Sequence, residues 1–322
     1  MIGDRFSKFN RAVFSLYEAA HVMPMASFQD AALNGLKDTL PFDSSMWGSA
    51  TMTDQGIDIH TLHLHNTSMQ MIDDYQKVKH LDHFAHEIAR HDQKTISFSA
   101  DRALVGDFQN FLFKHKHFHG LITQHLQPET RFVQWLSLFR HDAQHLCTDD
   151  DVAFLDLLFP HVMQALAISR KIHMTRLADE GRHALWAHAI ADRHGFLYYA
   201  DDVFLGLIAQ DYVNSQNDRL PNSVIHAISP QSTKLVGPHT LLATRWEKDF
   251  LFLKIRPKVL ADQLNEREFT IAKMLSDGLT VKDIADQLHR SPDTIRTQSK
   301  TIYKKLGVNK VTQLALLLTQ RD

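Results

Sequence analysis

The chain has 322 residues, 44% of them hydrophobic, which is enough for about two or three domains with packed cores. A formal net charge of −2 excludes a uniformly basic chromatin-type protein, and a single cysteine, Cys147, excludes a framework of intramolecular disulfides. The N-terminus lacks the apolar core of a signal peptide, and no apolar run approaches the ~20 residues of a membrane span. We therefore expect a cytoplasmic protein with no membrane association.

The first region, residues 1–175, mixes helix and strand signals. In chain order, helical or strand patterns occupy residues 12–20, 28–40, 46–52, 57–64, 95–98, 135–139 and 149–174. Residues 46–52 and 57–64 flank a turn signal at Asp54-Gln55-Gly56, and apolar and polar residues alternate in the second of them. This pattern predicts a β-hairpin inside an α+β sensor domain with an antiparallel sheet.

Histidine is unusually frequent in the first region. The chain has 22 histidines, with clusters at His80, His83, His86 and His91 and at His115, His117 and His119. Such spacings are also used by metal ligands. Because no cysteine pair or recognised metal motif accompanies them, we expect no metal and no other cofactor, and a role in pH sensing stays open. The phenylalanines in the same part, Phe108, Phe111, Phe113 and Phe118, are expected in the core.

The second region, residues 179–257, has the signals of a small sheet domain. A strand and turn at residues 194–202 precede an amphipathic helix at 203–212, and strands at 241–247 and 249–256 form a hairpin. These signals fit either a ligand-binding domain or a spacer with a filled core that supports dimerisation.

The last region, residues 262–322, has the most specific local signals, those of four short helices. Two capping boxes, Asn265 with Glu268 and Thr280 with Asp283, mark the first two helix starts. Ser291-Pro292-Asp293 opens the third helix with a capping hydroxyl and a proline at the first helical position. Gly278 and Gly307 stand where left-handed residues end helices. Two helices joined by a tight turn are the arrangement that DNA readers use.

Positive charge is concentrated on and beside the third of these helices. Its cations are Arg290, Arg296, Lys300, Lys304 and Lys305. The same segment contains one acid, Asp293, and the rest of the chain is nearly neutral. A basic helix of this kind gains from phosphate neutralisation and can read guanine edges in the major groove.

The segments Leu264-Asn-Glu-Arg-Glu, Asp277-Gly-Leu, Lys282-Asp-Ile-Ala, Ser291-Pro-Asp-Thr-Ile and Ile302-Tyr-Lys-Lys-Leu-Gly-Val resemble the C-terminal domain of the LuxR/GerE family. The resemblance implies a transcription regulator whose third helix enters the major groove of double-stranded DNA and whose fourth supports a homodimer. By position, it makes Arg296, Thr297 and Lys300 base-reading candidates. By the same comparison, Thr294, Lys304 and Lys305 are candidates for phosphate contacts. Arg290, just before the third helix, is a further candidate.

Two residues before the third helix depart from the family pattern. His289 stands where the family usually has glycine, and Arg290 stands where it usually has an aliphatic residue. Because histidine is among the residues that tolerate positive φ, we expect the turn to survive.

The upstream regions resemble known sensors in layout. Residues 1–175 resemble a GAF-type domain or the autoinducer-binding domain that precedes LuxR-type modules, and residues 179–257 resemble a PAS domain. Autoinducer receptors use a tryptophan, tyrosine and aspartate set, for which Trp47, Tyr75 and either Asp82 or Asp73 can be offered. Asp82 is followed by His83 where that family has proline.

Other functional classes lack the residues that they need. No phosphorelay receiver constellation occurs, and neither do a nucleophile elbow, a phosphate-cradling glycine loop or a dinucleotide fingerprint, so no enzyme is expected. We predict a one-component regulator that binds DNA as a homodimer, with RNA polymerase as a further candidate partner. Its signal would be a small molecule held in an aromatic pocket that includes Trp47, Tyr75 and Trp135. The alternative is a ligand-independent regulator whose N-terminal region is a dimerisation and protein-interaction platform.

Overall fold

A computed structural model of the chain describes residues 2–53, 56–88, 95–103, 105–180, 186–212, 218–228 and 233–321. Its contacts divide it into two compact units. The first unit comprises residues 1–176, 192–199 and 248–250. The second comprises residues 177–191, 200–247 and 251–322. The predicted turn residues Asp54 and Gln55 lie outside the described residues, as does His91.

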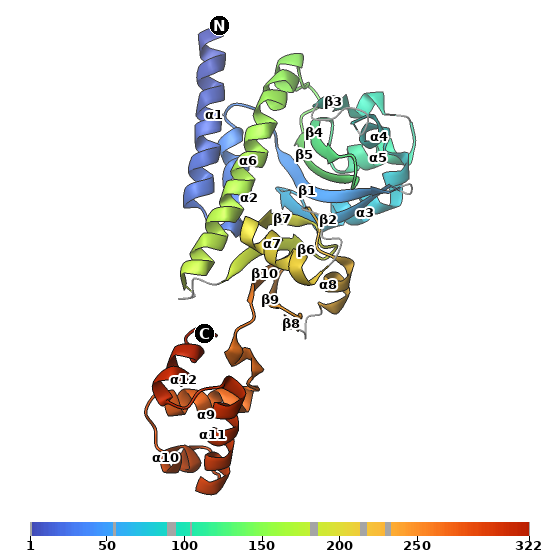
Figure 1. The fold of residues 1–322 in the computed structure, drawn as a ribbon. Helices are drawn as coiled ribbons and strands as arrows, with labels where there is room; N and C mark the ends of the chain where they lie inside the picture. Colours follow the sequence, from blue (N-terminus) through green and yellow to red (C-terminus); the bar gives the residue numbers. More distant parts are fainter. Residues whose placement is uncertain are drawn as a thin grey trace. The chain divides into compact units, whose positions relative to one another are not determined.

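A five-stranded antiparallel sheet is the centre of the first unit (Figure 1). Its order is β2-β1-β5-β4-β3. The strands are β1 (Ser44–Thr53), β2 (Gly56–His65), β3 (Ile96–Ser99), β4 (His119–Gln127) and β5 (Phe132–Arg140). The predicted hairpin of β1 and β2 is confirmed by their antiparallel pairing. Strand β4 was not predicted from the sequence.

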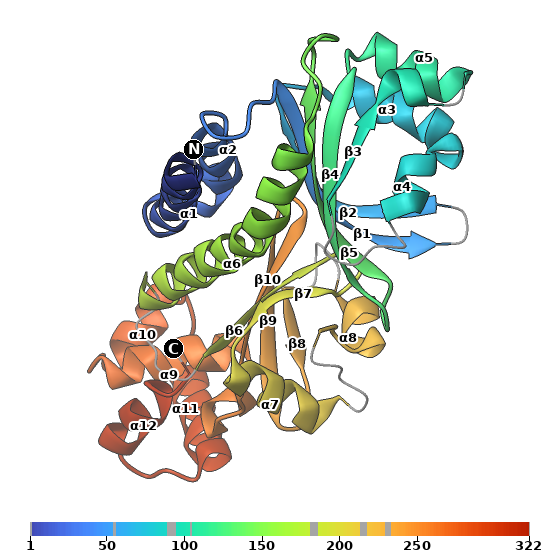
Figure 2. The same ribbon diagram turned by 90° about the horizontal axis from the view of Figure 1, so that it is seen from above.

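Helices cover both faces of this sheet, as Figure 2 shows. On one face lie α1 (Ile2–Val22), α2 (Met25–Leu36) and α6 (Asp149–Glu180). On the other lie α3 (Met69–Val78), η1 (Lys79–Leu81), α4 (His83–Ile88), η2 (Ala100–Arg102) and α5 (Asp107–Lys114). Each face therefore has its own apolar core, because alternate residues of a strand point to opposite sides of the sheet.

Helix α6 is longer and more apolar than the sequence analysis recognised. Its residues Asp149–Arg176 are long and apolar enough to cross a membrane by length and composition alone, although only 44% of the most apolar window is buried. Leu155, Leu158 and Val162 of this helix are fully buried in the core with α1, α2 and the sheet. These three residues of α6 thus belong to the core of the first unit.

Strand β2 contains a β-bulge at His60. Ser49 pairs with Thr61 and Ala50 pairs with Ile59, so His60 is the extra residue between them. The alternation of the sequence breaks at the same place, where His60 and Thr61 are both polar.

The bulged residue takes part in a buried polar network within the first unit. His60 Nδ1 lies 2.8 Å from Asp192 Oδ2, and Tyr198 donates its hydroxyl hydrogen to the same oxygen at 3.1 Å. The Tyr198 hydroxyl also lies against Ser49. Residues 192–199 are thus joined to the strands β1 and β2 by hydrogen bonds between buried groups, which are stronger inside a protein than at its surface.

A second five-stranded sheet has the order β7-β6-β10-β9-β8. Its strands are β6 (Ala187–Asp192), β7 (Leu197–Ala200), β8 (Lys234–Val236), β9 (Thr240–Glu247) and β10 (Phe250–Pro257), with α7 (Asp202–Asp211) and α8 (Asn222–Ala227) between β7 and β8. The predicted strands and helix of residues 194–257 agree with β7, α7, β9 and β10, while β6 and β8 were missed.

The chain ends in a bundle of short helices. They are η3 (Leu260–Gln263), α9 (Glu266–Ser276), α10 (Val281–Gln287), α11 (Pro292–Leu306) and α12 (Val311–Leu318). One apolar core holds them together, and its fully buried members include Ile271, Ile284, Ile295, Ile302 and Leu314.

Candidate nucleic-acid interface and ligand cavity

The helix starts of the C-terminal bundle are fixed by the capping residues that the sequence predicts. Asn265 and Glu268 bond each other's backbone amides at 2.8 and 3.0 Å, and Thr280 with Asp283 repeats the arrangement. Ser291 accepts a hydrogen bond from the Thr294 amide, with Pro292 at the first helical position of α11. Because a cap stabilises a helix by about 0.5–2 kcal/mol, these residues fix where α11 begins.

The turn between α10 and α11 is closed through a left-handed residue. His289 has φ of 51°, and the Arg290 amide donates to the Ala285 carbonyl at 2.9 Å. The turn expected to tolerate histidine in place of glycine is therefore confirmed.

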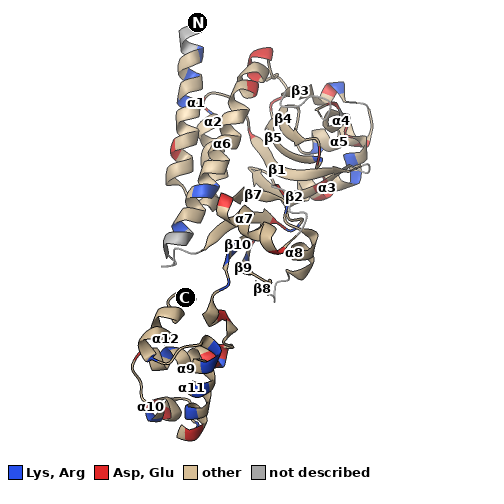
Figure 3. Ribbon diagram, in the orientation of Figure 1, with Lys and Arg blue, Asp and Glu red and all other residues tan. Residues whose placement is uncertain are grey.

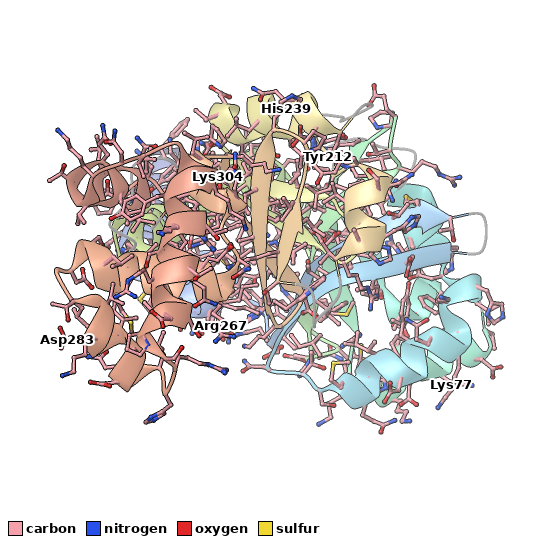
Figure 4. All side chains as sticks on the ribbon, turned by 60° about the horizontal axis from the view of Figure 1, so that its bottom comes forward. Lys77, Tyr212, His239, Arg267, Asp283 and Lys304 are labelled. Carbon is pink, nitrogen blue, oxygen red and sulfur yellow. The ribbon has the colours of Figure 1, made fainter. Side chains whose placement is uncertain are left out.

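Basic residues, blue on the ribbon of Figure 3, occur along α11 and just before it. Arg290, Arg296, Lys300 and Lys304 are all exposed, and we call this set the basic face. Figure 4 shows the side chains of the domain, with Lys304 labelled on α11 and Arg267 on α9. Exposed cations that follow one helix can approach the phosphates and base edges of one DNA groove.

Local contacts orient the predicted base-reading residues. Arg296 forms an ion pair with Asp293 one turn earlier in α11, and both side chains are exposed. Since exposed ion pairs contribute little free energy, Arg296 can leave Asp293 for a stronger partner. The Thr297 hydroxyl donates to the Asp293 carbonyl at 3.0 Å, and Thr294 lies 2.8 Å from the Ser291 hydroxyl in the cap.

Lys305 forms an ion pair with another residue of the same domain. Its Nζ donates to both carboxylate oxygens of Glu268, at 2.6 and 2.7 Å, and so ties α11 to α9. The hydrogen bond from Lys305 is the main reason that the pKa of the Glu268 carboxyl lies below its usual value. Lys305 is itself exposed, so it stays a predicted phosphate contact, for which it would have to leave Glu268.

The first unit contains an apolar cavity between its sheet and the helices α3, α4 and α5. The cavity has a volume of about 90 Å³. Its walls are mainly aliphatic and aromatic, and its polar side chains are Tyr75, Asp82, His117, Gln124 and Ser137. An apolar space with a few convergent polar groups is typical of a small-molecule site.

Tyr75 and Asp82 form the polar end of this cavity. The Tyr75 hydroxyl donates to Asp82 Oδ2 at 2.9 Å, and Asp82 Oδ1 accepts from the Ala85 amide at 3.0 Å. Burial raises the pKa of the Asp82 carboxyl, and burial together with the Asp82 charge raises the pKa of Tyr75. This end of the cavity therefore disfavours negative charge.

His117 contributes a neutral ring to the same cavity. It stacks on Phe139 with ring centroids 3.8 Å apart and an interplanar angle of 4°. Burial, aided by the neighbouring His115 and His141, lowers the pKa of His117 to about 3. The ring is thus uncharged near neutral pH, and it supplies an aromatic wall.

The position of Trp135 depends on a glycine that the sequence analysis overlooked. Trp135 and Gly48 are paired across β5 and β1. A Cβ atom at Gly48 would lie 2.7 Å from the Trp135 ring and 2.4 Å from the Thr61 carbonyl oxygen. The absence of a side chain at Gly48 therefore makes room for the indole on the cavity side of the sheet.

Of the three residues predicted for the aromatic pocket, the structure brings two together. Tyr75 and Trp135 both line the cavity. Trp47 is on the opposite face of β1, where it packs edge-on against Phe28 in the core with α1, α2 and α6. Its assignment to the pocket is corrected, because neighbouring positions of a strand face opposite ways.

The three histidines of the second predicted cluster have different partners. His115 caps α5 and lies 3.1 Å from Asp74, His117 faces the cavity, and His119 Nε2 lies 2.9 Å from the Ala143 carbonyl oxygen. Among the expected core phenylalanines, Phe108 and Phe111 are buried and also line the cavity. Phe118 is half-buried and Phe113 is exposed, so the prediction was wrong for Phe113.

Comparison with known proteins identifies the C-terminal bundle. Residues 262–318 match the family model for bacterial regulatory proteins of the luxR family. These residues therefore form a LuxR-type helix-turn-helix domain, as the sequence motifs predicted. The predicted fold class is confirmed as well, since two antiparallel sheets with helices precede this all-α domain.

Two curated relatives are similar to this chain in that domain. The response regulator GacA of Pseudomonas aeruginosa is 41% identical over 56 residues, which are 17% of this chain and 26% of GacA. The transcriptional regulatory protein UhpA of Escherichia coli is 39% identical over 54 residues, which are 17% of this chain and 28% of UhpA. The chain thus spans about a quarter of the length of the curated relatives that it matches.

Solved structures with a similar arrangement have low identity. The N-acylhomoserine lactone-dependent LuxR-family transcription factor CepR2 of Burkholderia cenocepacia is 15% identical, with 53% of this chain and 99% of that chain covered and a TM-score of 0.41. SdiA of Escherichia coli is 15% identical, with 94% and 92% covered and a TM-score of 0.33. A phycoerythrobilin-bound GAF domain of a cyanobacterial phytochrome is 10% identical, with 52% and 97% covered and a TM-score of 0.36.

Proposed function

We propose that the chain is a cytoplasmic, one-component transcriptional regulator that binds double-stranded DNA as a homodimer and responds to an uncharged small molecule. Residues 1–175 would be the sensor, residues 179–257 a PAS-like sensor or dimerisation domain and residues 262–322 the DNA-binding domain. The observation that carries the proposal is the exposed basic face on a helix whose start is fixed by Ser291 and Pro292.

The basic face supports separate roles for its members. Arg296 and Thr297 lie in the first half of α11, the part of a recognition helix that reaches base edges in helix-turn-helix proteins, and Lys300 lies one turn after Arg296. Thr294 is held by the cap, Arg290 precedes the helix and Lys304 lies in its last turn, and these positions suit phosphate contacts. In a homodimer, two such helices would meet half-sites ~34 Å apart. RNA polymerase would then be a partner of the DNA-bound dimer.

Selection of sites from a genomic fragment library by the full-length protein, followed by titrations at two salt concentrations, tests these roles. Arg296→Ala should weaken the selected site by about 1–3 kcal/mol and relax one base position. Lys304→Ala should weaken all sites alike and reduce the salt slope by about 0.9. Lys171→Ala, which removes an exposed cation from α6, is the matched control and should change neither. Equal losses on every sequence for Arg296→Ala would contradict its base-reading role.

The cavity supports control by an uncharged ligand. Its walls are apolar, the pKa of Asp82 is raised, and the ring of His117 is neutral, so a negatively charged ligand would be desolvated without a compensating partner. A dry apolar cavity of roughly 150 Å³ is known to bind benzene, so a cavity of about 90 Å³ suits a compact apolar group with one polar atom near Tyr75.

Thermal unfolding in the presence of benzene, phenol and benzoate tests this cavity. Benzene and phenol should raise the melting temperature of the full-length protein, because a ligand that binds only the folded state stabilises it. Ala85→Leu, which fills part of the cavity, should abolish the increase. Benzoate should have no effect, and stabilisation by benzoate equal to that by benzene would contradict an uncharged site.

A ligand-independent platform is the second candidate function. Phe6 and Phe14 of α1 and Leu157 of α6 are exposed large hydrophobic side chains in the first unit. Exposed apolar groups on neighbouring helices are typical of an association surface. If Phe14→Ser converts a dimer to a monomer in sedimentation and cavity filling leaves DNA binding unchanged, this function is favoured over ligand control.

A further inference from the structure

Three potential metal ligands converge at the surface of the first unit, outside the cavity. His63 and His65 are on β2, and Asp30 is on α2. His63 Nε2 lies 3.0 Å and His65 Nδ1 lies 2.8 Å from the same oxygen, Asp30 Oδ1. One ligand atom from each of the three residues lies within 4.8 Å of the others. Two imidazoles and a carboxylate thus point toward one place.

The elements that carry these groups make the arrangement a consequence of the fold. His63 and His65 are separated by one residue, so both side chains leave the same face of β2. That face is covered by α2, from which Asp30 reaches the two rings. Ligands on a strand and a helix are held more precisely than ligands on loops.

The donor atoms are chemically suited to a divalent transition metal ion. Two imidazole nitrogens and one carboxylate oxygen form a set used by zinc and non-haem iron proteins. A carboxylate binds a metal ion in its ionised form, which is the ordinary form of an aspartate side chain near neutral pH.

The site also has room for the ion and a route to it. The exposed fractions of the side chains are 7% for His65, 19% for His63 and 52% for Asp30, so the cluster is open on the Asp30 side. Ligands at 2.0–2.1 Å in a tetrahedron are separated by about 3.3 Å, which small rotations of these side chains would provide. Solvent would complete the coordination on the open side.

The second group with such spacing among the described residues, Asp58, His60 and His194, differs in one respect. Both ring nitrogens of His60 have partners, since Nδ1 faces Asp192 at 2.8 Å and Nε2 faces the Thr51 hydroxyl at 3.0 Å. Both nitrogens of His60 are thus already used in the buried polar network with Asp192 and Tyr198. In the first group, Asp30 is the hydrogen-bonded partner of both ligating nitrogens.

We propose that Asp30, His63 and His65 bind a zinc-class divalent metal ion. The ion would join α2 to β2, a strand whose opposite face lines the cavity through Ile57, Ile59 and Leu62. Metal binding would therefore stabilise the first unit next to its cavity. The proposal is independent of the DNA-binding role.

The test uses untagged full-length protein and Zn²⁺ in competition with a chromophoric chelator. One tight Zn²⁺ per chain is expected. Loss of groups that merely support a ligand lowers metal affinity by about 10- to 100-fold, so Asp30→Asn and His63→Gln should each lower it at least tenfold. His226→Gln, an exposed histidine of α8, is the control and should leave the affinity unchanged. Co²⁺ should give visible d–d absorption that the first two variants lose.

Asp30→Asn keeps the side-chain size at an exposed position, and far-UV circular dichroism checks that each variant is folded. Wild-type Zn²⁺ affinity in both Asp30→Asn and His63→Gln would overturn the proposal. So would the absence of tight Zn²⁺ binding to the wild-type protein.

Discussion

The LuxR-type domain and the first sheet unit are stabilised by contacts of very different span along the chain. In the LuxR-type domain, helix starts are fixed by residues three positions apart, such as Asn265 with Glu268. In the first unit, β1 pairs with the distant β5, and Arg140 Nε donates to the Pro41 carbonyl 99 residues away. Local contacts form at little cost in loop-closure entropy, whereas distant ones require most of the chain to be ordered first.

This difference predicts that the two parts unfold as separate cooperative units. The positions of the tryptophans make it possible to follow the unfolding of the two parts separately. All four tryptophans, Trp47, Trp135, Trp186 and Trp246, precede the LuxR-type domain. Trp47 and Trp135 belong to the first unit, so their fluorescence reports on that unit, while far-UV circular dichroism reports on the whole chain.

The largest effect is expected for Ile302→Ala. Ile302 is fully buried in the core of the LuxR-type domain, so the substitution should cost about 2–5 kcal/mol. A domain of this size is stabilised by only about 3–9 kcal/mol in total, so the loss is a large part of it. DNA binding and part of the helical signal should be lost at a lower temperature, with the tryptophan transition unchanged. A matching downward shift of the tryptophan transition would show that the parts unfold together.

A smaller effect, in the other region, is expected for Gly48→Ala. The added Cβ atom would collide with Trp135 and with the Thr61 carbonyl oxygen, and overpacking of this kind costs about 1–3 kcal/mol. The tryptophan transition should move to lower denaturant concentration while DNA binding by the folded protein persists.

Gly206→Ala is the matched control for that substitution. Gly206 lies in α7, and a Cβ atom there would meet nothing within 4 Å. Alanine should be neutral or stabilising by about 0.5–1 kcal/mol, because it restricts the unfolded chain. Equal destabilisation by both substitutions would refute the steric role of Gly48.

The smallest effect is expected for Glu268→Gln, and it depends on pH. The pKa of Glu268 is lowered in the folded state by Lys305, so its ion pair contributes above the ordinary value of 4.5 and is lost as pH falls through the folded value. The pair is worth under about 1 kcal/mol at a surface.

Thermal unfolding of the LuxR-type domain, followed by circular dichroism between about pH 6 and pH 3.5, measures this contribution. Glu268→Gln should lower stability at the higher pH and reduce the loss on acidification. Glu129→Gln, at an exposed position upstream, should leave the acid response of the domain unchanged. If Glu268→Gln left the acid response of the domain unaltered, the ion pair would not be its cause.

The same contrast explains what could be predicted from the sequence. Caps, helix ends and the left-handed turn at His289 depend on neighbouring residues, and all were predicted. The partner of Lys305 was not, because Glu268 is 37 residues away and meets it only in the folded domain. A helix cation that binds DNA and one that pairs with a neighbouring helix look alike in sequence.

In the first unit, the sequence predicted strands more reliably than it predicted their faces. Trp47 and Trp135 are both strand tryptophans, yet only Trp135 faces the cavity, since strand pairing decides which side of the sheet each residue occupies. Strand β4 was missed because polar residues and Gly120 weaken its strand pattern. The cluster of Asp30, His63 and His65 could not be predicted from the sequence either, because these residues meet only when α2 packs on β2.

The β-bulge of β2 has a consequence for how this strand tolerates changes of length. Ile57 and Ile59 face the cavity before the bulge and Leu62 faces it after, although the spacing from Ile59 to Leu62 is odd. A deletion of His60 would leave both halves of the strand in phase with the cavity and would cost the contact with Asp192. A deletion of Asp58 would instead move the side chains on one side of the deletion to the opposite face of the sheet. Insertions and deletions among related sequences should therefore fall at the bulge and spare the rest of the strand.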